Sequence, residues 1–174
     1  SNSPVLLTQV QTYNDSDWVV SRTNEINRDS FKFSMQEEEL NNRDGDHETE
    51  SIGWLAIDSG GNADGFLGVE SYEAATTGYI FNHRASTAAF NYSFTDTPAL
   101  IAKLGSYRGR DTANIRITDV TPSGFSSLVK EEQSADSEVF HFKESINYLG
   151  LNGSNGSLNL NPISTFNITA PDNI

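Results

Sequence analysis

The chain has 174 residues, of which 36% are hydrophobic and 10% aromatic, a composition typical of a folded globular protein. Its net charge is −13, from 24 acidic and 11 basic residues, which excludes nucleic acid and anionic membranes as natural partners. Cysteine is absent, so no disulfide or thiolate site is expected, and no apolar run is long enough for membrane insertion.

Strand signals dominate the first third of the chain. Residues 5–13 and 18–23 are rich in β-forming residues, and the cluster of Asn, Asp and Ser between them predicts a turn. Residues 31–36 alternate apolar and polar side chains, as a half-buried strand does. Residues 37–50 are strongly polar and predict a loop, and residues 51–57 predict a largely apolar strand.

The same order of elements recurs in the second half. Strands are predicted there at residues 99–107, 113–118, 125–130 and 145–151, with shorter ones at 78–81 and 88–94. No segment shows sustained helical periodicity. We therefore predict an all-β fold of two tandem antiparallel β-sandwich repeats, residues 1–80 and 81–174.

An internal duplication relates the two halves. A shift of 94 positions aligns residues 4–62 with residues 98–156 without a gap, and 13 of the 59 pairs are identical. Some identical residues are apolar or turn residues, which a common fold explains. The others are charged or titratable and are candidate functional residues: Arg22, Glu37, Glu38, His47 and Glu50, repeated as Arg116, Glu131, Glu132, His141 and Glu144.

Several positions match the pattern of a known family. Residues 4–7 read Pro-Val-Leu-Leu, residues 51–57 read Ser-Ile-Gly-Trp-Leu-Ala-Ile, residues 120–125 read Val-Thr-Pro-Ser-Gly-Phe, and Arg22 stands in the second predicted strand. This pattern resembles the H-type lectin domain, a six-stranded antiparallel sandwich found in snail agglutinins and in the C-terminal half of discoidins. The resemblance covers about two thirds of the chain.

The resemblance implies binding of oligo- or polysaccharides, with galactose-type sugars favoured, at a shallow surface site. The Trp-His pair of the family falls on Glu38-Glu39 and Glu132-Gln133 here, so the identity of the sugar does not carry over. Trp18 follows a polar turn and is a candidate stacking ring, whereas Trp54 is expected in the core. The predicted ligand-binding residues are Trp18, Arg22, Glu37, Glu38, Glu39, His47, Glu50, Arg116, Glu131, Glu132, His141 and Glu144.

The acidic residues that end the third predicted strand admit several interpretations. Glu37 shares a strand face with apolar residues, and a buried carboxylate needs a partner. That partner is Arg22 in a structural lock, His47 with Glu50, or a metal ion, and solvation of the loops is a further alternative. Oxygen donors favour calcium as the metal. The candidate metal ligands are Asp44, Asp46, Asp58 and Asp64.

Three functions therefore stay open. The first is a carbohydrate-binding module of a secreted bacterial multidomain protein, with the other domains of a larger chain as partners. The second is a calcium-stabilised structural or adhesin repeat without glycan binding, and the third is a protein-interaction module that uses sheet edges. In each case we expect an extracellular or cell-surface location. We expect no enzymatic activity, because the chain has no serine elbow, HExxH motif or phosphate loop.

Overall fold

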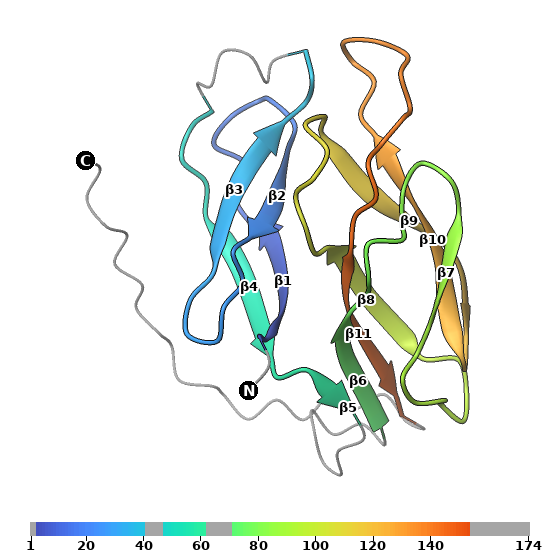
Figure 1. Ribbon diagram of the computed structural model, residues 1–174. Helices are drawn as coiled ribbons and strands as arrows, with labels where there is room; N and C mark the ends of the chain where they lie inside the picture. Colours follow the sequence, from blue (N-terminus) through green and yellow to red (C-terminus); the bar gives the residue numbers. More distant parts are fainter. Residues whose placement is uncertain (1–2, 41–46, 62–70, 154–174) are drawn as a thin grey trace.

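The computed structural model describes residues 3–40, 47–61 and 71–153, and all regular structure in them is β-strand (Figure 1). The prediction of an all-β fold is confirmed. None of the described residues forms a helix that could cross a membrane. The strands are β1 (Val5–Val10), β2 (Val19–Asn24), β3 (Lys32–Glu37), β4 (Ile52–Ile57), β5 (Gly60–Gly61), β6 (Ser71–Thr76), β7 (Ser86–Ala89), β8 (Ala99–Leu104), β9 (Ala113–Thr121), β10 (Gly124–Glu131) and β11 (Ile146–Asn152).

The second half, together with β5 and β6, forms two facing antiparallel sheets. One has the strand order β7-β10-β9 and the other the order β5-β6-β11-β8. The core between them is aromatic: Phe125 of β10 stacks on Phe81 and meets the edge of the Tyr148 ring of β11. Phe90, from the segment that follows β7, closes over both Phe125 and Tyr148.

The first half consists of two two-stranded sheets, β1-β4 and β2-β3, which lie to the left in Figure 1. Side chains alternate along a strand, so Tyr148 of β11 faces the aromatic core while Leu149 faces the opposite side of its sheet. On that opposite side, Val5, Leu7 and Ile57 pack against Leu149 and Ala74. Sheet β1-β4 therefore covers the outer face of the larger sheet.

The duplication extends to strand pairing. β1 pairs with β4 from Val5↔Ile57, and β8 pairs with β11 in the same register, 94 positions later. The pairing of β2 with β3 likewise begins at Val19↔Glu37, and that of β9 with β10 reaches the equivalent pair Ala113↔Glu131. β6 lies within residues 1–80 but pairs with β11 of the second half. A division at residue 80 and two complete tandem sandwiches stay predictions.

One expectation about the core is wrong. The apolar sequence of its strand predicts Trp54 in the core, but its side chain is 39% exposed. Its counterpart Tyr148 is 2% exposed. Tyr148 is covered by Phe90 and by Glu73 of β6, which accepts a hydrogen bond from its hydroxyl. Among the described residues, β4 pairs only with β1, so no strand equivalent to β6 covers Trp54.

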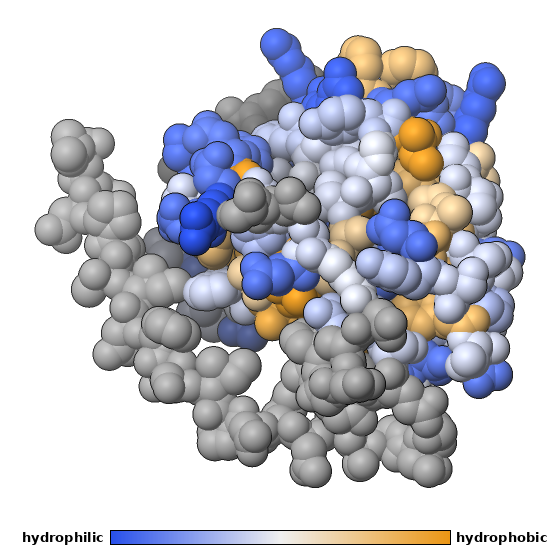
Figure 2. All heavy atoms as spheres, turned by 60° about the horizontal axis from the view of Figure 1, so that its bottom comes forward, coloured by the Kyte–Doolittle hydropathy of each residue, from blue (hydrophilic) through white to orange (hydrophobic). Residues whose placement is uncertain are grey.

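The surface is predominantly polar. On the face turned forward in Figure 2, hydrophobic residues occur in small separate groups among hydrophilic ones. This distribution is consistent with the net charge of −13.

Candidate functional site

Three candidate residues of the second half meet in a buried cluster. His141 lies between two carboxylates, with Nδ1 2.6 Å from Oε1 of Glu131 and Nε2 3.2 Å from Oε1 of Glu144. Glu131 is the last residue of β10, and the other two come from the segment that leads into β11. The expected grouping of a strand-end glutamate with the His and Glu of the following loop is thus present in the second half.

Arg22 joins this cluster from the first half. Its Nη2 donates hydrogen bonds to Oε1 of Glu144 (3.1 Å) and to the carbonyl oxygen of Ser106 (3.2 Å). Its Nη1 donates to Oε1 of Gln36 at 2.9 Å, and its guanidinium lies 4.5 Å from the centre of the Tyr107 ring. Arg22 is 1% exposed. A buried ion pair therefore ties β2 of the first half to the second half.

Glu144 is the most heavily bonded group of the network. Besides Arg22, it accepts hydrogen bonds from the backbone N–H groups of Arg108 (2.8 Å) and Gly109 (3.0 Å) and from the Ser106 hydroxyl. Burial alone would raise its pKa, but the bonds from His141, Ser106 and these backbone groups outweigh burial and lower the pKa to about 2. Glu144 is therefore a carboxylate at neutral pH.

Glycine is required at position 109. A Cβ there would lie 2.2 Å from Cε1 of the His141 ring, which is far too close for a carbon contact. A side chain at position 109 would therefore displace the His141 ring from its place between the carboxylates.

The pKa values of the other two groups move upward. Burial tends to lower the pKa of His141, but its bonds to Glu144 and Glu131 more than offset this and raise it. Both ring nitrogens lie within hydrogen-bonding distance of carboxylates, an arrangement that favours the doubly protonated imidazolium. Burial raises the pKa of Glu131, and its pairing with His141 only partly counteracts that effect.

Glu50 and Glu144 make the same local contacts in the two halves. Glu50 accepts hydrogen bonds from the Thr12 hydroxyl and from the backbone N–H of Asn14 (2.8 Å), and the Thr12 hydroxyl accepts one from the N–H of Ser51 (2.7 Å). At positions shifted by 94, Glu144 accepts from Ser106 and Arg108, and Ser106 accepts from Ser145. The repeated glutamate therefore ties the turn after one strand to the start of another.

The rest of the network is not repeated. His47 bonds the backbone carbonyl of Glu48 at 2.8 Å rather than a glutamate side chain. Arg116, the counterpart of Arg22, is exposed on β9. The structure thus brings together Glu131, His141 and Glu144 with Arg22 of the other half, and it leaves His47, Glu50 and Arg116 apart from them.

An acidic cluster lies beside the network. Oxygens of Asp111, Glu131 and Glu138 lie within 4.8 Å of one another. The backbone N–H of Glu39 donates to Oε2 of Glu132 at 2.8 Å, which brings two further predicted residues to the same region. Burial and the negative charge of Asp111 raise the pKa of Glu39 to about 7.

Of the four predicted metal ligands, the structure describes Asp58 alone. Asp44, Asp46 and Asp64 are outside the described residues, and Asp58 is exposed in the turn after β4. Of the cluster near Glu39, Glu131 is a predicted ligand-binding residue and Glu138 an expected oxygen donor of its loop, whereas Asp111 was not predicted as a ligand. Asp111 was recognisable, because it is identical to Asp17 at the shift of 94.

Hydroxyl residues were also missed. Thr12 and Ser106 occupy equivalent positions and bond equivalent glutamates, but a search for identical residues overlooks a pair in which Thr replaces Ser.

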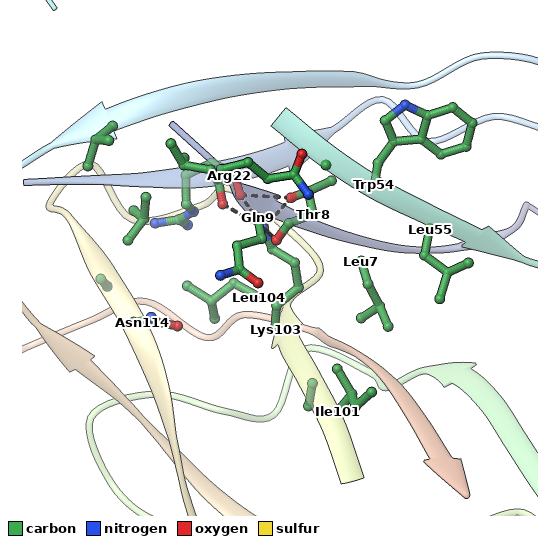
Figure 3. Close-up of a pocket in the computed structure, with 18 of the residues that line it drawn as sticks. Leu7, Thr8, Gln9, Arg22, Trp54, Leu55, Ile101, Lys103, Leu104 and Asn114 are labelled. Carbon is green, nitrogen blue, oxygen red and sulfur yellow. Dashed lines mark hydrogen bonds between the residues drawn. The ribbon is translucent and has the colours of Figure 1, made fainter. Parts of the chain in front are cut away.

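A cavity of about 600 Å³ lies between the two halves (Figure 3). Lys103 of β8 projects into it and donates hydrogen bonds to the carbonyl oxygen of Ser21 (2.7 Å) and to Thr8. Burial, with a smaller effect of Arg22, lowers the pKa of Lys103 to about 7. Trp18 also lines the cavity and is 45% exposed, and its role as a stacking ring stays a prediction.

Comparison with known proteins gives one match. No family model matches the chain, and no solved structure matches it. The chain is similar to halomucin from Haloquadratum walsbyi, with 30% identity over 154 residues, which make up 88% of the chain. It spans 2% of the length of that relative, so halomucin is several thousand residues long. The H-type lectin resemblance stays a prediction.

The charge of His141 makes its contribution to stability depend on pH. Its pKa in the folded chain lies above the unfolded value of 6.5, so the contribution is complete below pH 6.5 and is lost as the pH rises through the folded pKa. We expect the difference in melting temperature between the wild-type chain and His141→Gln to be largest below about pH 6 and to shrink above about pH 6.5. Thermal unfolding followed by circular dichroism measures both.

Comparison at each pH removes the effect of Lys103, which titrates in the same range in both proteins. The matched control is His47→Gln at the equivalent position. Burial tends to lower the pKa of His47, but backbone hydrogen bonds and the charge of Asp15 more than offset this and raise it as well, so its difference has the same pH dependence. We expect that difference to be smaller, because the ring is less buried than that of His141. A wild-type advantage that is constant with pH would show that His141 is not an imidazolium in the folded chain.

Proposed function

We propose that this chain is a structural module of a very large extracellular protein. The observation that carries the proposal is the repeated bonding of Glu50 and Glu144. A glutamate that ties the same turn in both halves is retained for the fold, because these contacts are the same in both, although among the described residues only Glu144 is also bonded to an arginine.

The buried network supports the same proposal. Arg22, Glu131, His141 and Glu144 were expected to contact sugar, yet all four are at most 5% exposed and bond one another. The buried ion pair between Arg22 and Glu144 fixes the position of one half relative to the other. The first interpretation of the acidic loops, an arginine–carboxylate lock, describes this arrangement, with Arg22 paired to the glutamate of the other half.

The similarity to halomucin is compatible with an extracellular structural or adhesin-like domain. A chain that matches 2% of such a long relative has the size of one module among many. The acidic surface suits this setting, because net charge keeps a protein soluble and discourages unspecific association.

Substitution of Arg22 tests the structural proposal. Arg22→Met leaves the buried Glu144 without its arginine, and we expect it to lower the free energy of unfolding by about 3 kcal/mol or more. Arg116→Met is the matched control: it makes the same change at the equivalent exposed position and should alter the free energy by about 0.5 kcal/mol or less. Urea denaturation measures both, and equal effects of the two variants would contradict a structural lock.

Carbohydrate binding is a second candidate, and the cavity between the halves favours it. Trp18 offers an exposed ring there, and Gln9, Gln11 and Asn114 supply amide groups that can bond sugar hydroxyls. In Figure 3, Trp54 and Leu55 lie on opposite sides of β4, and the Trp54 ring points away from Lys103.

A sugar titration tests this candidate. If the cavity binds galactose-type oligosaccharides, the ligand raises the melting temperature in proportion to ln(1 + [L]/Kd), and Trp18→Ala abolishes the rise. Tyr13→Ala is the control, because this exposed ring does not line the cavity. A melting temperature that no oligosaccharide changes, or a rise that Trp18→Ala retains, rejects sugar binding at this cavity.

Calcium binding would add to the structural role. The carboxylates of Asp111, Glu131 and Glu138 offer the oxygen donors that calcium prefers, and the raised pKa of Glu39 reflects the negative charge gathered around them. We expect excess calcium to raise the melting temperature relative to chelator, and Glu138→Gln to reduce that rise. Asp119→Asn, an exposed acid on β9, should leave it unchanged. Identical melting in calcium and chelator would exclude the ion from this function.

A further inference from the structure

Equivalent strands of the two halves have different neighbours. β11 is paired on both sides, by β6 and β8, whereas β4, its counterpart at the shift of 94, pairs only with β1 among the described residues. Likewise β10 lies between β7 and β9, whereas β3 pairs only with β2 in that part of the chain. Each of these first-half strands therefore has one edge that no described strand pairs, where its counterpart is paired.

Burial follows the same pattern. Tyr148 of β11 is 2% exposed, but its counterpart Trp54 is 39% exposed. Phe125 of β10 is buried in the aromatic core, whereas Phe31 at the equivalent position is only half-buried. Phe33 of β3 is exposed as well. We call the surface formed by Phe31, Phe33 and Trp54, with the edges of β3 and β4 that no described strand pairs, the open face.

The open face already contains half of an aromatic core. Phe31 and Trp54 lie 5.3 Å apart with an interplanar angle of 62°. Their counterparts Phe125 and Tyr148 lie 5.2 Å apart at 66°. The same edge-on ring pair is therefore formed in both halves, and only the second-half pair is covered.

The cover of the second-half pair comes from one stretch of chain. Residues 71–97 supply β6, which pairs with β11, and β7, which pairs with β10. The same stretch supplies Phe90, which lies 5.9 Å from Phe125 and 5.7 Å from Tyr148, and Glu73, which bonds the Tyr148 hydroxyl. In sequence it runs directly into Pro98, the counterpart of Pro4.

We propose that the open face is the docking site for a segment of the same kind as residues 71–97, contributed by a neighbouring repeat of a longer polypeptide. A strand like β6 extends the sheet at the edge of β4 that no described strand pairs, a strand like β7 pairs with β3, and an aromatic residue like Phe90 covers Phe31 and Trp54. Such strand addition satisfies backbone groups and buries apolar side chains together. This inference rests on the proposed role as a structural module.

The sequence supports a series in which each repeat contributes strands to the sheets of the next repeat. Residues 165–170 stand 94 positions after β6, and Phe166 occupies the position of Tyr72. The 21 residues from 154 to 174, which lie outside the described structure, thus include a second β6-like sequence beyond the last described strand. A repeat that receives one such segment and offers another joins its neighbours in a continuous series.

The test is to supply the proposed segment. In the full chain, residues 71–97 are duplicated in place of residues 1–3, so that Thr97 precedes Pro4 as it precedes Pro98. In a Trp18→Phe background, Trp54 is the only indole, and its fluorescence should move to shorter wavelength as the ring is covered. We expect the melting temperature to rise by about 5 °C or more, because new pairing and burial are added.

The control carries the same extension with Phe90→Ser and Phe94→Ser in the duplicated copy only, and it should gain less in both measurements. Unchanged Trp54 emission and melting temperature with the native extension would overturn the proposal. So would concentration-dependent dimerisation that buries Trp54 in the unextended chain, or a Trp54 emission that moves to longer wavelength when residues 154–174 are removed. The Arg22→Met experiment remains independent, so failure of the extension alone leaves the structural role intact.

Discussion

The arrangement of the two halves depends on one buried carboxylate. Glu144 is fully removed from solvent, and a charge in that environment is stable only when surrounding donors replace the lost water. Its donors come from distant parts of the chain: Arg22 from β2, Ser106 with the backbone of residues 108 and 109, and His141. Because all must be present together, the carboxylate fixes where β2 lies against the second half.

The duplication gives identical residues different roles. Arg22 and Arg116 share a strand position and a register, yet one is buried against the other half and the other faces solvent. His47 and His141 differ in the same way, since only the second meets carboxylates on both sides. Two copies packed asymmetrically present different surfaces to each other. Symmetry is therefore kept inside each strand pair and lost between the halves.

The sequence predicts local structure better than contacts between halves. Alternation of apolar and polar residues, with turn residues between, predicted β1 to β4 and their counterparts. The alignment at a shift of 94 predicted that His141 and Glu144 lie in the same loop. The same alignment led us to pair Arg22 with a carboxylate of its own half, because an alignment of two copies contains no information on how the copies pack against each other. The placement of Trp54 in the core failed for a related reason. An apolar strand predicts a buried face, but burial also requires the covering strand, and no described strand covers β4 there.

Polar contacts between the halves suit a module within a series better than an apolar contact would. An apolar surface tolerates sliding, whereas Asn147 bonding the Leu6 carbonyl (2.9 Å) and Lys103 bonding that of Ser21 (2.7 Å) each require one position. Leaving such buried groups unbonded costs free energy, so misaligned pairings of similar strands are disfavoured. In a protein with many related strands, pairing each strand with its correct partner is harder to achieve than burying enough apolar surface. The buried ions and amides therefore contribute selectivity among similar partners, while apolar burial, including that available at the open face, contributes most of the stability.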